Sequence, residues 1–160
     1  MKKTFFAMTL LILFTYSVEG STEVNAKTFR CDMSVIGQKL SRGVYLKFTV
    51  TNLTNHKLRL LSWYTPLEGF LSDLFIIKNE TDESLDYNGI MVKRNNPSHD
   101  DYLVLSSEES VDVTLDLTQA YPLVQGEYTV QLASKSWSYI QDQIPLTSLC
   151  SSDSLKIKVS

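Results

Sequence analysis

Residues 44–51 read Val44-Tyr45-Leu46-Lys47-Phe48-Thr49-Val50-Thr51, an alternation of apolar with polar or amphipathic side chains. Successive side chains of an extended chain point to opposite faces, so four apolar residues share one face here. This pattern predicts a β-strand that buries one face in a core and exposes the other to water. The same alternation recurs in residues 111–116 and 155–160. An antiparallel, strand-rich fold is therefore expected.

Six further segments have the composition of short strands. They are residues 29–36, 57–63, 74–78, 89–93, 102–105 and 127–133. Clusters of Asn, Asp, Gly, Pro and Ser between them favour tight turns. Beyond the N-terminal region no segment has a convincing helical stripe, although residues 117–121 could form one short turn. We predict an all-β protein with an antiparallel immunoglobulin-like β-sandwich, and a closed barrel is the alternative.

The first twenty residues have the parts of an export signal. Lys2 and Lys3 form a positive start, and residues 5–16 form an almost uncharged apolar run. This run is shorter than the roughly 20 residues that a helix needs to cross a bilayer. An uncleaved membrane anchor is the alternative interpretation. We therefore expect the protein to be exported, either to the periplasm or outside the cell.

Signal cleavage is expected after Gly20, because Val18 and Gly20 are the small or β-branched residues that such a site requires. A second candidate site follows Ala26. The expected organisation is a signal peptide, residues 1–20, followed by one β-sandwich domain, residues 21–160. A domain of this length is large enough to fold around its own core.

The charge of the chain excludes some classes of function. The formal net charge is −3, and loss of residues 1–20, which contain two lysines and one glutamate, changes it to −4. A mildly acidic chain without a basic run lacks the electrostatic footprint of a nucleic-acid-binding protein. No segment after Tyr16 is long and apolar enough for a second membrane span, so we expect no membrane association after signal cleavage.

Two cysteines, Cys31 and Cys150, remain after the predicted signal peptide. An exported chain meets an oxidising compartment, and an even cysteine count there favours a disulfide. A reactive thiol pair is the alternative, although the Cys-x-x-Cys spacing is absent. We interpret residues 134–154, between two good strand candidates, as a long connection held in place by a Cys31–Cys150 bridge.

The sequence offers little to an enzyme mechanism. His56 and His99 both lie in polar turn contexts, and no His-Glu-x-x-His motif is present. Residues 99–101, His-Asp-Asp, are interpreted as a solvated loop rather than as part of a catalytic triad. Asp82, Glu83 and Asp86 are an unspecific candidate for calcium. We expect no enzymatic activity, no metal site and no cofactor.

The most specific stretch is residues 63–69, Trp-Tyr-Thr-Pro-Leu-Glu-Gly. Further aromatic, glycine and charged residues follow it at ordered spacings. The motif residues that we interpret as structural are Trp63, Pro66, Gly69, Asp73, Tyr87, Gly89, Lys93, Arg94, Asp101 and Tyr102. The ordered string resembles the non-catalytic β-sandwich domain that precedes the catalytic domain of secreted lysine-specific zinc endopeptidases of the aspzincin, deuterolysin-like family. The resemblance covers about residues 45–132.

This resemblance implies a sandwich fold and a connection with a secreted zinc metalloprotease. In that family the domain is taken as an N-terminal pro-region or accessory module, and no zinc-binding protease motif is present here. Our hypothesis is an exported protein-binding module that acts as inhibitor, pro-region-like or accessory partner of an extracellular protease. The alternative is a structural or adhesive protein of the envelope, with exposed Trp137 and Tyr139 stacking on a sugar or an apolar patch.

An exposed aromatic and apolar loop is what a protein-binding surface requires. The candidate protein-binding residues are Tyr64, Leu67, Glu68, Phe70 and Leu71.

Structural roles are the competing interpretation of the same string. In that interpretation Glu68 satisfies backbone N–H groups, or pairs with Lys93 or Arg94. Trp63 then belongs to the core, and Tyr102 is a corner tyrosine whose hydroxyl bonds to backbone.

Overall fold

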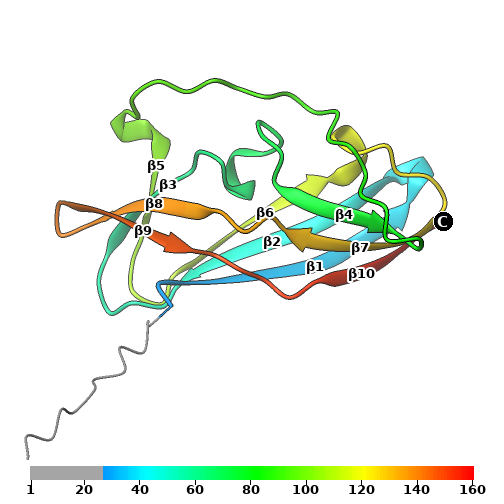
Figure 1. The fold of residues 1–160 in the computed structure, drawn as a ribbon. Coiled ribbons are helices and arrows are strands. Elements are labelled where there is room, and N and C mark those ends of the chain that lie inside the picture. The colour runs from blue at the N-terminus through cyan, green and yellow to red at the C-terminus, as the bar shows by residue number, and fades with distance from the viewer. Residues whose placement is uncertain (1–26) are drawn as a thin grey trace, which may run out of the picture.

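The structure is a computed structural model, and it describes residues 27–160. The signal peptide expected at residues 1–20 and both candidate cleavage sites lie outside the described residues. Ten strands make up about half of the described chain (Figure 1). They are β1 (Phe29–Lys39), β2 (Gly43–Asn52), β3 (Leu58–Leu61), β4 (Phe75–Asn79), β5 (Tyr102–Leu105), β6 (Ser110–Asp116), β7 (Gly126–Leu132), β8 (Ser136–Gln141), β9 (Ile144–Leu149) and β10 (Leu155–Val159).

Four single turns of 3-10 helix join some of these strands. They are η1 (Leu40–Arg42), η2 (Pro66–Glu68), η3 (His99–Asp101) and η4 (Leu117–Gln119). The last of them lies within the segment for which the sequence allowed one short turn. No helix in residues 27–160 has the length and hydrophobicity that crossing a bilayer requires.

Every pairing between strands is antiparallel, and the strands form three sheets in the orders β1-β2-β6, β10-β7-β4 and β5-β3-β8-β9. Strand β2 is the centre of the first sheet, and its four inward side chains, the apolar set of residues 44–50, are at most 1% exposed. Leu46 of β2 lies opposite Leu115 of β6 in the register, so the alternation predicted for both strands places them on the same core.

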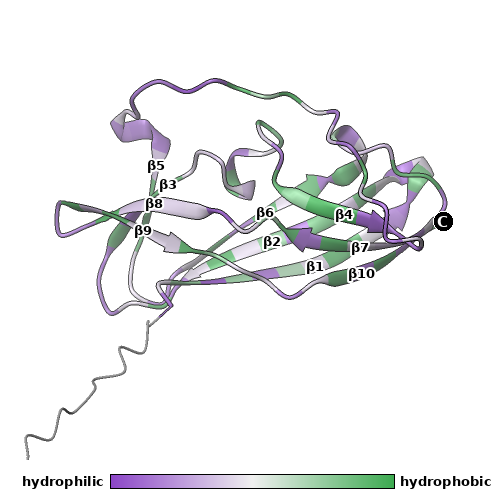
Figure 2. Cartoon of the chain, in the orientation of Figure 1, coloured by the Kyte–Doolittle hydropathy of each residue, from purple (hydrophilic) through white to green (hydrophobic). Residues whose placement is uncertain are grey.

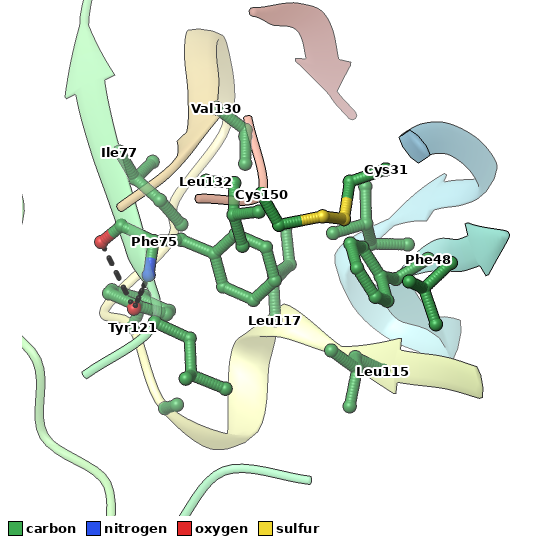
Figure 3. Close-up of a cluster of buried hydrophobic side chains, with 14 of the residues drawn as sticks. Cys31, Phe48, Phe75, Ile77, Leu115, Leu117, Tyr121, Val130, Leu132 and Cys150 are labelled. Carbon is green, nitrogen blue, oxygen red and sulfur yellow. Dashed lines mark hydrogen bonds between the residues drawn. A yellow bond between two sulfur atoms is a disulfide. The ribbon is translucent and has the colours of Figure 1, made fainter. Parts of the chain in front are cut away.

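The core lies between the first sheet and the other two, which makes the protein an all-β antiparallel sandwich, as predicted. Figure 3 shows Phe75, Ile77 and Val130, from the sheet of β4 and β7, on the opposite side of the cluster from Phe48 and Leu115. Figure 2 shows hydrophobic residues gathered along the strands, while the turns and the long connection from β4 to β5 are mostly hydrophilic. This separation is the thermodynamic basis of the fold, since burial of apolar surface drives folding.

The predicted disulfide is confirmed. Cys31 of β1 is bonded to Cys150, which follows β9, and the Cα atoms of the two residues are 5.9 Å apart. Both residues are buried, so the bridge is part of the core (Figure 3). It connects the sheet of β1 directly to the segment that leads from β9 into β10.

The interpretation of residues 134–154 as a long connection is wrong, because this region forms the β8–β9 hairpin. Its two-residue loop, Asp142-Gln143, has φ values of 49° and 66°. Two positive φ values give the loop the twist that a tight hairpin needs. The usual sequence signal for such a loop contains glycine, which explains why the hairpin was missed.

The idea that Trp137 and Tyr139 stack on a sugar at the surface is also wrong. The two side chains are 3% and 7% exposed. Their ring centres lie 5.9 Å from Phe48 and 5.4 Å from Phe29, respectively, so they fill the space between β8 and the sheet of β1 and β2. Both residues therefore belong to the core.

Residues 89–93 do not form the strand that was expected. A single backbone hydrogen bond, from Val92 N to Leu71 O at 3.0 Å, links this segment to a loop rather than to a strand. The segment therefore has no ladder of hydrogen bonds and remains irregular, as part of the long connection that runs along the top of the view in Figure 1.

Candidate functional site

The motif residues meet where two loops of the sandwich lie side by side. The first loop is residues 62–74, between β3 and β4, and the second is residues 80–101, between β4 and β5. We call these two segments the paired loops. Backbone hydrogen bonds from Ser62 N to Asp101 O, at 2.9 Å, and from Val92 N to Leu71 O join them. Residues that are more than twenty positions apart in the sequence thus become neighbours.

Four motif side chains form a chain of contacts across the paired loops. The carboxylate of Glu68 forms an ion pair with the Arg94 guanidinium. The guanidinium carbon lies 5.0 Å from the centre of the Trp63 ring, in a cation–π arrangement. Trp63 Nε1 donates a hydrogen bond of 2.8 Å to Asp101 Oδ1. Because Glu68 and Arg94 are only 7% and 21% exposed at their side chains, water screens this pair less than a surface pair.

Glu68 also holds the backbone of Tyr64, since its Oε1 accepts a 2.7 Å hydrogen bond from Tyr64 N. Tyr64 has a φ of 59°, in the left-handed region that a bulky residue rarely occupies. Its side chain is nevertheless 42% exposed. One carboxylate therefore pins an exposed aromatic residue in a strained backbone conformation and ties it to Arg94 on the neighbouring loop.

Asp101 closes the chain of contacts and is the last residue of η3. Its Oδ2 accepts hydrogen bonds of 2.7 Å from both the hydroxyl and the backbone N–H of Ser98. These two hydrogen bonds, first that of the hydroxyl, stabilise the charged form and lower the pKa of Asp101, with smaller contributions from Trp63 and Arg94. The residue is thus ionised whenever the domain is folded near neutral pH.

This lowered pKa predicts a pH dependence of stability. A carboxylate with a depressed pKa in the folded state stabilises the fold above its unfolded pKa, which is about 4, and loses this contribution as the pH falls through the folded pKa. We expect the urea concentration at the unfolding midpoint of the wild type to decrease as the pH is lowered below about 4. The midpoint of the Asp101→Asn variant should decrease less over the same pH range. Equal slopes for the two proteins would contradict the role of Asp101.

Beside this chain of contacts lies a group of aromatic residues that carries other motif positions. The ring centres of Tyr87 and Phe70 lie 5.5 Å and 6.1 Å from that of Tyr121, in edge-on arrangements. The Tyr121 hydroxyl donates to Asp73 Oδ1 at 2.9 Å. It also accepts a hydrogen bond from Phe75 N at 3.1 Å (Figure 3). Burial, and then the neighbouring Asp73 carboxylate, raise the pKa of Tyr121 far above its ordinary value. The Tyr121 phenol is therefore uncharged, and it holds Asp73 and Phe75 through its hydrogen bonds.

The sequence predicted that the hydroxyl of Tyr102 bonds to the backbone. In the structure it is Tyr121 that makes this kind of contact. No hydrogen bond of the Tyr102 hydroxyl is found in the described part of the chain, and Arg59 lies over its ring at 5.8 Å. The interpretation of Tyr102 as a corner tyrosine is wrong, because its side chain stays half-exposed on β5. Trp63 is likewise half-buried beneath Arg94 rather than part of the core.

Gly89 is required by the close approach of Tyr87. The Tyr87 hydroxyl donates to the carbonyl of Ile90 at 2.8 Å, and a Cβ atom added to Gly89 would lie 2.5 Å from the same hydroxyl. We expect Gly89→Ala to displace the ring and to cost about 1–3 kcal/mol in urea unfolding. Asn88→Ala, at an exposed neighbouring position, is the control and should change the midpoint little. Equal midpoints for the two variants would contradict the packing argument.

The five candidate protein-binding residues all lie on the first of the paired loops, but they differ in exposure. Tyr64 is open to solvent, whereas Leu67, Phe70 and Leu71 are half-buried. The Glu68 side chain is covered, and it pairs with Arg94 while Lys93 remains exposed.

Sequence reasoning missed two exposed apolar residues on the second loop. Ile90 and Met91 are 66% and 73% exposed. The interpretation of residues 89–93 as a strand concealed them, because a strand there would have buried one of every two side chains.

The described residues show no arrangement typical of a metal centre. Within residues 27–160 no group of three His, Cys, Asp or Glu side chains is placed to hold a metal ion. His99 and Asp100 are 81% and 99% exposed at their side chains, in keeping with a solvated loop.

Comparison with known proteins connects part of the chain to a protease. No known protein-family profile matches it. The chain is 31% identical over 90 residues to an extracellular protease of Aeromonas hydrophila, and the match covers 55% of this chain and 25% of the protease. The chain thus spans about a quarter of the length of this relative.

Two solved structures are also similar, at low identity. The structural-genomics target SoR45 has a TM-score of 0.41 and 9% identity, over 82% of this chain and 87% of that one. The ApaA protein of Bordetella pertussis has a TM-score of 0.41 and 13% identity, over 83% and 96% of the two chains. Residues 27–160 form a disulfide-linked antiparallel β-sandwich by their own strand pairing. Over 90 residues the sequence is similar to an extracellular protease.

Proposed function

We propose that this chain is an exported, non-catalytic module that binds an extracellular endopeptidase, as inhibitor, pro-region-like or accessory partner. The observation that carries the proposal is the similarity to an extracellular protease over 90 residues that amount to only 25% of that protein. The buried disulfide supports an oxidising compartment outside the cytosol.

The paired loops provide the binding surface in this proposal. Their backbones are held by the Glu68–Arg94 pair and by the aromatic group around Tyr121, so little conformational entropy is lost when a partner binds. Tyr64, Ile90 and Met91 expose apolar and aromatic surface on this rigid support. Aromatic residues and methionine are enriched at protein interfaces. The surface therefore suits a protein partner.

The strained backbone of Tyr64 supports a functional role for its side chain. Residues kept in disfavoured conformations, at a cost of order 1–3 kcal/mol, concentrate at binding and active sites. Asparagine tolerates the left-handed region far better than tyrosine. A tyrosine at a φ of 59° is thus better explained by what its ring would contact in a partner than by the stability of the loop.

The Tyr64→Asn variant separates these two roles. We expect its free energy of unfolding to stay unchanged or to rise by up to about 1 kcal/mol, because strain is relieved. Binding to the endopeptidase should weaken at least tenfold, because the exposed ring is lost. The control is Ile144→Asn, which removes a similarly exposed apolar side chain, 57% exposed, from the distant β8–β9 hairpin. Equal affinities for both variants would contradict a role for Tyr64.

Capture from the exported fraction tests the proposal itself. Residues 21–160, with the disulfide formed, are immobilised, and the exported proteins of the source organism are passed over them. Enrichment of an endopeptidase, identified by mass spectrometry and rebound after purification, is the expected result. Retention of envelope components alone would favour the structural or adhesive alternative.

A further inference from the structure

The connection between β4 and β5 presents a short apolar segment, Ile90–Lys93, away from the sandwich. Figure 1 shows the connection as a long trace along the top of the view that leads to η3. No turn, bend or strand occurs between Ile90 and Asn95, so this part of the chain runs on without folding back. The side chains of Ile90, Met91 and Lys93 are exposed, and only that of Val92 is half-buried.

The segment is anchored to the protein at every second residue. The Ile90 carbonyl accepts a 2.8 Å hydrogen bond from the Tyr87 hydroxyl. Val92 N donates to Leu71 O at 3.0 Å. Arg94 follows, and its guanidinium pairs with Glu68. Leu71 and Glu68 of the first loop and the hydroxyl of Tyr87 provide these anchors. They hold the segment in one conformation before any partner binds.

The intervening residues leave their backbone groups free. In the described part of the chain, neither the N–H nor the C=O of Met91 or Lys93 takes part in a hydrogen bond. Backbone groups of an extended chain point alternately to its two sides, so the side opposite the Val92–Leu71 hydrogen bond is open. An extended peptide of this kind can add to an exposed strand, with its alternate side chains in pockets.

A substrate cleft is the partner surface that fits these features. An endopeptidase must bind a stretch of polypeptide rather than a chain end, and an internal, anchored, apolar segment meets that requirement. Pre-ordering of the segment reduces the entropy that binding would otherwise cost. Complexes between proteases and pre-organised inhibitors bind tightly with little backbone movement.

We infer that Ile90–Lys93 binds in the substrate cleft of the partner endopeptidase in a substrate-like conformation, so that the module is a cleft-blocking inhibitor. This inference rests on the proposed function, and it selects inhibition among the roles considered there. Met91, the most exposed of the three apolar residues in this segment, enters the cleft deepest, and Tyr64 lies on the supporting loop.

Steady-state inhibition of the purified, captured endopeptidase tests this inference with a fluorogenic peptide substrate. The wild-type module should raise the apparent KM and leave kcat unchanged, as competition for the cleft requires. Met91→Asp should raise the inhibition constant at least tenfold, because a carboxylate would then be desolvated in the complex. Ile144→Asp, the control at an exposed apolar position of the β8–β9 hairpin, should inhibit like the wild type. Equal thermal midpoints for both variants establish that each is folded.

Three results would overturn the inference. The first is a lower kcat with an unchanged apparent KM. The second is an inhibition constant for Met91→Asp that equals that of the wild type. The third is rapid cleavage of the module within residues 90–94, followed by its release. In each case the captured endopeptidase would still support the proposed function, with a different surface or role. Failure to bind any endopeptidase would instead remove the proposed function.

Discussion

Removal of the Cys31–Cys150 disulfide is expected to lower the free energy of unfolding by about 4–5 kcal/mol, which follows from closure of a loop of about a hundred residues in the unfolded chain. The bonded residues are separated by 119 positions, so the bridge restricts most of the described chain. In a domain of this size that loss corresponds to a fall in Tm of about 10 °C or more. No other single change considered for this protein has so large an expected effect.

The measurement compares thermal unfolding of the oxidised protein, the reduced protein and the Cys31→Ala/Cys150→Ala variant. The reduced protein and the variant should melt close together and well below the oxidised form. Both cysteines are buried, and two alanines leave only small cavities, which contribute less than the lost constraint. An identical Tm with and without reductant would contradict the presence of the bridge in the folded protein.

Glu68→Ala should have the second largest effect, a loss of about 2–4 kcal/mol of stability. Breaking a buried ion pair by removing one partner costs about 3–5 kcal/mol, because the other charge is left without compensation. The 21% exposure of the Arg94 side chain reduces that penalty. The variant also removes the acceptor for Tyr64 N, so the strained residue loses the contact that holds it.

A double-mutant cycle separates the pair from the packing around it. Glu68→Leu, Arg94→Met and the combined variant are unfolded in urea, and their free energies are compared. We expect the combined variant to be more stable than the sum of the single losses predicts, since no unpaired charge remains. Additive losses would mean that the two side chains act independently, which contradicts the ion pair across the paired loops.

The strands that could be predicted from the sequence were mainly those whose residues alternate between apolar and polar side chains. Strands β2, β6 and β10 alternate between core and water, and β5 coincides with the predicted residues 102–105. The β8–β9 hairpin could not be recognised, because its Asp142-Gln143 loop lacks the glycine that marks such turns. Trp137 was consequently placed at the surface, although it lies in the core.

The candidate site was predictable only in part, for a related reason. Pairing of Glu68 with Arg94 was one alternative from the sequence, since opposite charges in one motif suggest a pair. The hydrogen bond from Trp63 to Asp101 and that from Tyr121 to Asp73 join residues 38 and 48 positions apart. Local periodicity holds no information about such long-range contacts.

The paired loops combine the features on which the proposed function depends. The Glu68–Arg94 pair and the aromatic residues around Tyr121 make them rigid, and Tyr64, Ile90 and Met91 make them apolar at the surface. The proposal takes its class of partner from the similarity to an extracellular protease. Stability and binding should therefore respond to different substitutions, with Glu68→Ala lowering the first and Tyr64→Asn lowering the second.

The most direct test of protease binding is a calorimetric titration of the purified, captured endopeptidase with wild-type residues 21–160 and with the Tyr64→Asn and Ile144→Asn variants. We predict saturable one-to-one binding for the wild type and Ile144→Asn, and at least tenfold weaker binding for Tyr64→Asn. Absence of saturable binding by the folded wild-type protein would contradict the proposal that this sandwich is a protease-binding module.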